Sequence, residues 1–324
     1  MSVKPTVFFT RSAPPNGVAL LAQECELQIW ESEDPIPREE LLRRVKGIHA
    51  LFVHPPIRVD SELFDAAGPQ LKVVGTMSVG LDHVDLAECK KRNIPVGNTP
   101  GVLTSAVAEL TVTLLLATAR RMKQAFQAVH NGSWGTWESG MWMTGTLLEG
   151  KTLGVVGLGR IGMAATRRLK PFGFSKILYC GRSKKSYDAE VGAEFVDFLQ
   201  LLKESDIVIA TCSITDENKG LFNKRAFKAM KNTSIFINVT RGALVNQDDL
   251  FEALTTGEIG SAGIDVTTPE PLATDDKLLS LSNLTVSPHI GSATVESRSA
   301  MCEVTARNIL AGLKGEPLPS PVLI

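Results

Sequence analysis

Residues 152–170, TLGVVGLGRIGMAATRRLK, decide how the rest of the chain is interpreted. An apolar run at 153–156, typical of a buried parallel strand, leads into a glycine-rich turn and then an amphipathic helix. In such a turn the first glycine permits the tight bend, the second lets a pyrophosphate approach, and the third lets the helix lie against the strand. A second strand expected at 176–180 completes the setting, and a turn kept for packing alone is the alternative. The residues predicted to bind the dinucleotide are Gly157, Leu158, Gly159, Arg160, Ile161 and Gly162.

Composition bounds the functions open to the chain. Its 324 residues are 44% hydrophobic and 21% charged, enough for two globular domains. A formal net charge of -1 gives no field for nucleic acid or an anionic membrane. The five cysteines are widely spaced without a C-x-x-C pair, which indicates free thiols and no metal site. With no signal peptide and no apolar run of bilayer length, a cytoplasmic protein is expected.

The first hundred residues alternate between short strand-like runs and helical patterns such as residues 37–45. Such alternation predicts a doubly wound parallel sheet, in which ligands bind beyond the carboxyl ends of the strands. The loops after the third and fourth runs, which begin at His54 and Met77, therefore need a chemical interpretation. In the second loop, Val79 and Gly80 could offer backbone N–H groups to a carboxylate, or Gly80 could form a plain turn. The expected strands are 6–10, 26–30, 48–53, 71–76 and 94–96.

A long helix is expected at 101–120, followed by a stretch rich in glycine and tryptophan. Trp134, Trp137 and Trp142, three of the four tryptophans of the chain, lie in this stretch. Aromatic side chains with little charge suit an interface, so the stretch predicts a subunit contact or a wall of the substrate site. Folding back onto its own domain is the alternative.

The strand and helix alternation resumes at 152, so we expect an α/β protein with two doubly wound, Rossmann-like domains and an active-site cleft between them. Residues 106–287 are predicted to bind the dinucleotide. Residues 1–105 and 288–324 are predicted to bind the substrate. The final helix, expected at 294–313, is most simply returned to the first domain, which makes that domain discontinuous. The later strands are expected at 206–210, 234–238, 260–264 and 284–286.

The end of the second strand of the nucleotide fold distinguishes NAD(H) from NADP(H). An NAD enzyme usually places an acid there, on the ribose 2′-hydroxyl. This chain has Gly181-Arg182-Ser183-Lys184 instead. Arg182 can bind a 2′-phosphate through two parallel charge-assisted hydrogen bonds, and Ser183 can donate another, so NADP(H) is predicted over NAD(H). The alternative is a solvated basic turn, with the acid supplied by Asp188.

Three candidate catalytic side chains each follow an expected strand of this second sheet. Arg241 follows 234–238, Glu270 lies in the loop after 260–264, and His289 follows 284–286. Taken singly they could be a surface arginine, a loop carboxylate and a structural histidine. Together, at the carboxyl edge of one sheet, they supply an anchor for a carboxylate, a group that tunes a histidine, and a proton donor.

At these residues the chain resembles the D-isomer-specific 2-hydroxyacid dehydrogenases, over essentially its whole length. The glycine-rich turn and the Arg241, Glu270 and His289 motifs occur in family order. Residues 181–183 depart from the wider family because they replace the acid. The stretches most similar to the members that reduce glyoxylate and hydroxypyruvate are 76–80, 169–173, 246–250 and 289–294.

The resemblance implies roles for individual residues and a homodimer. Arg241, Glu270 and His289 would be the catalytic set, and Asp265 would face the nicotinamide end of the cofactor. Further cofactor contacts would come from Gly181, Arg182, Ser183, Lys184, Ser213, Val239 and Gly291. The substrate would be bound by Val79, Gly80, Arg241, His289, Ser292 and Trp142 of the partner subunit.

The implied reaction is NADPH-dependent reduction of glyoxylate to glycolate and of hydroxypyruvate to D-glycerate. Arg241 would hold the carboxylate, His289 would protonate the carbonyl oxygen, and Glu270 would stabilise the charged histidine. One rival is a dehydrogenase of the same family for another 2-oxo acid, such as the oxidised form of 3-phosphoglycerate, although no appended regulatory domain is expected after residue 324. The other is a nicotinamide-sensing corepressor of the same fold, for which the termini are short and the cofactor turn is unusually basic.

Overall fold

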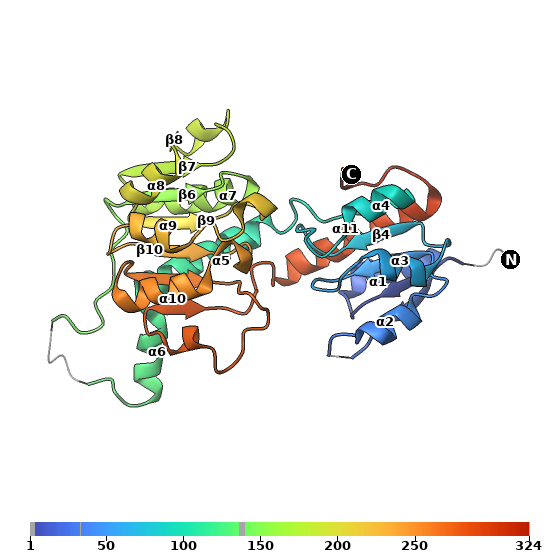
Figure 1. Ribbon diagram of the computed structural model, residues 1–324, viewed down its shortest axis with the longest axis horizontal. Helices are drawn as coiled ribbons and strands as arrows, with labels where there is room; N and C mark the ends of the chain where they lie inside the picture. The colour runs from blue at the N-terminus through green and yellow to red at the C-terminus, as the bar shows by residue number, and fades with distance from the viewer. Residues whose placement is uncertain (1–3, 33, 136–139, 324) are drawn as a thin grey trace. The chain divides into compact units, whose positions relative to one another are not determined.

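The chain forms two compact units in the computed structural model, which describes residues 4–32, 34–135 and 140–323 (Figure 1). One unit comprises Met1–Leu103 and Ser292–Ile324, and the other comprises Thr104–Gly291. The boundaries expected from the sequence fall after residues 105 and 287 instead. They differ because the first long helix of the larger unit begins at Thr104, and because the loop that carries His289 is hydrogen-bonded to Asp265 of that unit. No helix in the described ranges is long and apolar enough to cross a membrane.

The smaller unit contains a five-stranded parallel sheet in the order β2-β1-β3-β4-β5, and each strand expected from the sequence is present. Helix α11 comes from the end of the chain and packs on α1, β3 and β4. Strands β3 and β4 are buried along their whole length, because their apolar residues are covered on both faces of the sheet. The strands are β1 (Thr6–Phe9), β2 (Glu26–Ile29), β3 (Ala50–Val53), β4 (Val73–Thr76) and β5 (Val96–Gly97). The helices are α1 (Pro15–Glu24), α2 (Arg38–Arg44), α3 (Ser61–Ala67), α4 (Leu86–Arg92) and α11 (Val295–Lys314).

The larger unit contains a seven-stranded parallel sheet in the order β12-β11-β10-β9-β6-β7-β8. The strand order reverses between β6 and β9, which is where open α/β sheets bind nucleotides. The strands are β6 (Thr152–Val156), β7 (Lys176–Cys180), β8 (Ala193–Phe195), β9 (Ile207–Ala210), β10 (Ile235–Asn238), β11 (Ser261–Ile264) and β12 (Leu284–Val286). The helices are α5 (Thr104–Ala119), α6 (Met122–His130), α7 (Arg160–Leu169), α8 (Phe198–Glu204), α9 (Lys224–Ala229) and α10 (Gln247–Thr256). The predicted fold class is confirmed.

Two elements of the larger unit are not expected from the sequence. Strand β8 is three residues long and two of them are exposed, so it has no apolar run or alternation long enough to detect. Helix α6 closely follows α5: only Arg120 and Arg121 separate them, and Arg121 has a left-handed φ of 53°. The residues between the two helices include no glycine or proline, so the sequence gives no sign that the helix is interrupted.

The core of the larger unit is built from the apolar strands and a cluster of phenylalanines. Phe236 on β10 lies 4.6 Å, between ring centroids, from Phe222, and it also contacts Phe227 on α9. Helix α5 packs on α7 and on β10 and β11. The strand ends are therefore held rigidly, and the loops that follow them are placed by this core.

Candidate active site

The loops that carry the predicted catalytic residues, the glycine-rich turn and the basic loop lie along one edge of the larger sheet, because its strands are all parallel. The three catalytic candidates follow β12, β11 and β10, at one end of this edge. The glycine-rich turn and the basic loop follow β6 and β7, further along. In sheet order from β12 to β7, the edge carries His289, Asp265, Arg241, Ser213, Gly157 and Gly181.

His289 and Glu270 form a hydrogen-bonded pair. The Nδ1 atom of His289 lies 2.7 Å from Oε2 of Glu270, and the two side chains are 46% and 36% exposed. Among the described residues, none forms a hydrogen bond with Nε2 of His289. The pair therefore leaves one ring nitrogen available to a substrate while the other is fixed by a carboxylate.

The backbone around His289 is held in an unusual conformation by its neighbours. His289 has a φ of +52°, in the left-handed region that non-glycine residues rarely adopt. Its N–H donates to the carbonyl of Asp265 at 2.8 Å. The buried Asp265 carboxylate accepts hydrogen bonds from Ser287 Oγ, at 2.6 Å, and from the N–H groups of Ile290 and Gly291. A strained residue fixed in this way is typical of a functional site.

Glu270 is held as a carboxylate. Its partial burial raises its pKa, but the hydrogen bonds from His289 and from the Thr267 N–H, together with the charge of Arg241, outweigh burial and lower the pKa below its usual value. The Thr267 N–H reaches Oε1 at 2.9 Å, so each carboxylate oxygen has its own donor. A negative charge thus lies beside the imidazole at neutral pH.

Arg241 is positioned by the strand it follows and by the neighbouring loop. The buried amide of Asn238, the last residue of β10, donates from Nδ2 to the Arg241 carbonyl at 2.9 Å and accepts from the Thr240 N–H. Gly242 approaches the neighbouring loop so closely that a Cβ there would lie 2.1 Å from the Thr267 backbone. This contact brings the Arg241 loop against the loop that carries Glu270.

The glycine-rich turn has the geometry that a dinucleotide needs. Gly157 has a φ of +100°, and a Cβ at Gly162 would lie 2.3 Å from the Gly157 carbonyl oxygen, so neither position accepts a side chain easily. At Gly159 a Cβ would meet no heavy atom within 4 Å. The space beside Gly159 is therefore open, at the N-terminus of α7 where backbone N–H groups face outward.

The basic side chains of the loop after β7 are exposed, whereas the acidic residue Asp188 is buried. Arg182, Ser183 and Lys184 are exposed, and Arg182 forms no hydrogen bond or ion pair with another described residue. Asp188 is 9% exposed and accepts a hydrogen bond from Tyr179 Oη at 2.9 Å. The alternative in which Asp188 binds the ribose 2′-hydroxyl is therefore disfavoured, because its carboxylate faces inward.

The loop after β4 in the smaller unit presents two backbone donors. The carbonyl of Gly80 accepts from Ser78 Oγ at 2.7 Å, and the carbonyl of Val79 accepts from Asn98 Nδ2 at 3.1 Å. No described residue accepts a hydrogen bond from the N–H of Val79 or Gly80. Two adjacent unpaired N–H groups on an accessible loop are suited to a carboxylate.

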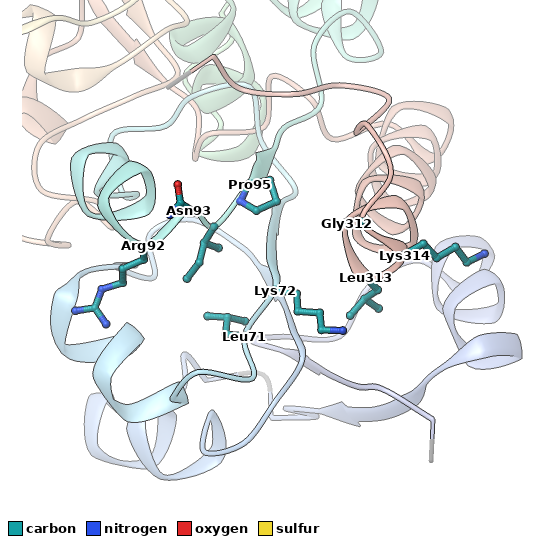
Figure 2. A pocket seen from close by; sticks show the side chains of 10 residues that line it. Leu71, Lys72, Arg92, Asn93, Pro95, Gly312, Leu313 and Lys314 are labelled. Atoms are coloured by element: carbon teal, nitrogen blue, oxygen red, sulfur yellow. The ribbon is translucent and has the colours of Figure 1, made fainter. Parts of the chain in front are cut away.

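A surface pocket of the smaller unit lies at the other edge of its sheet. Its walls come from residues just before β4 and β5 and from the ends of α4 and α11, and in Figure 2 the side chain of Lys314 points away from the other labelled residues. The loop of Val79 and Gly80 follows β4, whereas this pocket precedes it, so the pocket is no part of the candidate active site. Its lining residues are Leu71, Lys72, Arg92, Asn93, Ile94, Pro95, Gly312, Leu313, Lys314 and Gly315.

The chain is similar to known proteins in sequence and in fold. Residues 112–291 match the family model described as D-isomer specific 2-hydroxyacid dehydrogenase, NAD binding domain. The chain is 52% identical to glyoxylate reductase/hydroxypyruvate reductase of Mus musculus, over 97% of this chain and 96% of the relative. The chain belongs to the D-isomer-specific 2-hydroxyacid dehydrogenase family.

Solved structures agree with this family assignment. The TT0316 protein of Thermus thermophilus superimposes with a TM-score of 0.92 at 40% identity, covering 98% of this chain and 100% of that one. An NADPH-dependent glyoxylate/hydroxypyruvate reductase of Sinorhizobium meliloti, solved with NADP and malonate, has a TM-score of 0.85 at 31% identity, covering 98% and 97%. The resemblance stated from the motifs is confirmed, and the chain is an oxidoreductase of this family.

The structure groups the predicted family residues in two sets. The catalytic set and all predicted cofactor residues belong to the larger unit, where Val239 is buried directly after β10. Val79, Gly80 and Ser292 belong to the smaller unit. Trp142 is 50% exposed on the larger unit, and Trp137 lies outside the described residues.

Several supporting residues of the site are not predicted from the sequence. Asn238, Thr267, Ser287 and Gly242 position the catalytic loops by hydrogen bonds or close contact. Their signal in the sequence is their place at the ends of expected strands, where polar residues and glycine interrupt an apolar run. That signal locates the loops, but it does not show which partner each side chain has.

Proposed function

We propose that the protein is an NADPH-dependent reductase of glyoxylate and hydroxypyruvate. The observation that carries the proposal is the His289–Glu270 pair, 2.7 Å apart, with Arg241 close enough for its charge to lower the pKa of Glu270. This set can hold a 2-oxo acid by its carboxylate and protonate its carbonyl oxygen. The names of the mouse relative and of the Sinorhizobium meliloti structure support this choice of substrate.

The residues of the larger unit fit a nicotinamide dinucleotide. Gly159 leaves open space at the N-terminus of α7, where the first N–H groups of the helix can bind the pyrophosphate. The exposed Arg182, which pairs with no other described residue, suits a ribose 2′-phosphate, and the carboxylate of Asp188 is buried against Tyr179. We therefore assign dinucleotide binding to the larger unit, which also carries Arg241, Glu270 and His289, and we propose the N–H groups of Val79 and Gly80 in the smaller unit as further donors to a carboxylate.

The reaction adds a hydride to the 2-carbon and a proton to the carbonyl oxygen, which gives the 2-hydroxy acid. A reduced nicotinamide held by the glycine-rich turn and the loop after β7 would supply this hydride. Arg241 orients the substrate by pairing with its carboxylate. His289 gives a proton from Nε2 to the carbonyl oxygen, and Glu270 stabilises the imidazolium before the transfer.

Turnover by the purified protein tests the proposal. We expect NADPH to be oxidised on addition of glyoxylate or hydroxypyruvate, with glycolate or D-glycerate as the product identified by chiral chromatography. Phosphohydroxypyruvate and pyruvate serve as comparison substrates at equal concentration. Faster turnover of phosphohydroxypyruvate would contradict the proposed substrate class.

Cofactor preference gives the next prediction. Arg182→Ala should reduce the preference for NADPH over NADH by about 10- to 150-fold, because one charge-assisted contact to phosphate is lost. The KM values for NADPH and NADH measure the effect, and NADH use should stay nearly unchanged. Lys228→Ala, which removes a cation from the last turn of α9, is the matched control. An equal loss with both cofactors would show that Arg182 has another role.

A homodimer is proposed on the basis of the apolar side chains exposed around α6. Phe126 and Val129 on α6 are 59% and 57% exposed, and Trp134, Met141 and Trp142 follow at 66%, 74% and 50%. So much exposed apolar surface on one segment is typical of an interface. We propose that the larger units pair there and that Trp142 lines the substrate site of the partner. The five unpaired cysteines, four of them buried, are compatible with a cytoplasmic protein.

Mixed dimers test the position of Trp142. When a His289→Ala subunit is paired with a Trp142→Ala subunit, contribution in trans places both substitutions in one site and leaves the other site intact. Contribution in cis leaves neither site intact. We expect half of the sites to keep wild-type kcat/KM for hydroxypyruvate. A population without wild-type-like sites, or a monomer in sedimentation at micromolar concentration, would contradict the proposal.

The pH dependence of the rate tests the role of Glu270. Its lowered pKa means that Glu270 carries a charge at neutral pH, and a carboxylate 2.7 Å from an imidazole favours the protonated ring. Glu270→Gln removes the charge, so the alkaline limb of the reduction rate should move to lower pH by about 1 unit. The kcat profile between pH 5 and 9 measures this shift. An unchanged profile would remove Glu270 from the proton-donating pair.

A further inference from the structure

The chain has two tyrosines, Tyr179 and Tyr187, and both fix the loop that follows β7. Tyr179 is fully buried on β7, where its hydroxyl accepts from the Lys185 N–H at 2.7 Å and donates to Asp188 at 2.9 Å. Tyr187 donates from its hydroxyl to the carbonyl of Leu158, in the glycine-rich turn, at 3.0 Å. The loop is therefore attached to the sheet by one tyrosine and to the nucleotide-binding turn by the other.

The attachment at Leu158 does not compete with a bound phosphate. Tyr187 uses a carbonyl oxygen, whereas an anion at this turn would bind to N–H groups at the start of α7. The open space beside Gly159 is also preserved. The hydroxyl of Tyr187 can thus hold the loop without occupying the hydrogen-bond donors that the cofactor requires.

The attached loop is the one that presents Arg182, Ser183 and Lys184. These residues lie between Cys180, at the end of β7, and the hydrogen bonds made by residues 185–188. A loop without the second attachment would have to be ordered on binding, and that loss of conformational freedom weakens binding. The hydroxyl of Tyr179 also holds the Asp188 carboxylate in its buried position.

We propose that Tyr187 is a positioning residue that preorganises the basic loop for a ribose 2′-phosphate. The inference rests on the proposed use of NADP(H). It assigns to Tyr187 an effect on cofactor selection through the backbone of the loop, without contact with the cofactor. Its signature is a selective loss of affinity for nucleotides that carry a 2′-phosphate.

Calorimetric titration with two nucleotide fragments tests this signature independently of catalysis. Tyr187→Phe keeps the ring and removes the hydroxyl. We expect it to weaken the binding of 2′,5′-ADP by about 3- to 10-fold, as for one lost hydrogen bond, and to leave 5′-AMP within about 2-fold. In steady-state assays the KM for NADPH should rise by the same factor, while kcat and the KM for NADH stay unchanged.

Thr255→Val is the matched control, because it also removes an exposed hydroxyl that donates to a backbone carbonyl, in α10. It should leave both affinities unchanged. Unchanged 2′,5′-ADP binding in Tyr187→Phe, or equal weakening of both fragments, would overturn the role of Tyr187. The wild-type protein separates this failure from that of the premise: equal wild-type affinity for the two fragments would overturn the proposed use of NADP(H) itself.

Discussion

His289→Ala should lower kcat for glyoxylate reduction by about 10²- to 10⁴-fold, the usual range for a positioned proton donor. The structure leaves Nε2 of His289 as the ring nitrogen that can face the carbonyl oxygen, because Nδ1 is bound to Glu270. Steady-state rates at saturating NADPH measure the loss. The affinity for NADPH, followed by fluorescence titration, should change little, because no cofactor contact is assigned to the imidazole.

A second variant separates the chemistry from the backbone. His289 has a φ of +52°, which asparagine adopts more readily than alanine. His289→Asn should therefore keep the loop conformation and still lose the proton donor. We expect both variants to show the same loss of kcat. Substantial kcat in the asparagine variant alone would mean that the alanine variant fails through its backbone, and that His289 is no proton donor.

Most of the fold is predictable from the sequence because its strands are short apolar runs that end at glycine or polar residues. The run at 153–156 and the glycines after it specify a strand, a turn and a helix at once. The elements that are not predicted lack this contrast between an apolar run and the glycine or polar residues that end it. Two of the three residues of β8 are exposed. Helix α6 begins after Arg121, whose left-handed conformation is not indicated by any glycine or asparagine at that position.

The catalytic candidates are predictable for a related reason. In a parallel sheet the carboxyl ends of the strands lie along one edge, so residues far apart in the sequence, such as Arg241 and His289, can be assigned to one region. Which of these side chains pair with one another is not predictable in this way. The 2.7 Å contact between His289 and Glu270 depends on hydrogen bonds that position the two loops. Ser287 donates to Asp265, and the Thr267 N–H donates to Glu270.

The orientation of acidic side chains illustrates what pattern alone leaves open. The sequence offers Asp188 as an alternative acid for the ribose, because it lies near the expected position. In the structure its carboxylate is buried and bound to Tyr179. An Asp188 that binds the ribose and an Asp188 that is buried have the same residue type and the same spacing from the glycine-rich turn. Only the direction of the side chain distinguishes the two. That direction is set by a tyrosine nine residues earlier, on the strand.

Arg241→Lys should lower kcat/KM for glyoxylate by about 10²- to 10³-fold, although the positive charge is kept. A guanidinium presents planar paired donors that match a carboxylate, whereas an ammonium is a single point charge on a flexible stem. Loss of this geometry allows the substrate to rotate relative to the proton donor. A small displacement of the substrate carbonyl from the proton donor lowers the rate strongly. Both a higher KM and a lower kcat are therefore expected.

The same comparison of arginine and lysine at another position provides the control for Arg241. Arg307 lies on α11 and pairs with Glu303 at the surface, so Arg307→Lys should leave both parameters unchanged. NADPH affinity should also be kept in Arg241→Lys, because Asn238 still holds the turn through the backbone carbonyl of residue 241. If Arg241→Lys lost affinity for NADPH and glyoxylate together, the arginine would be holding the loop rather than the substrate. If kcat/KM stayed within about 3-fold of the wild type, a point charge would suffice and the planar fork would have no role.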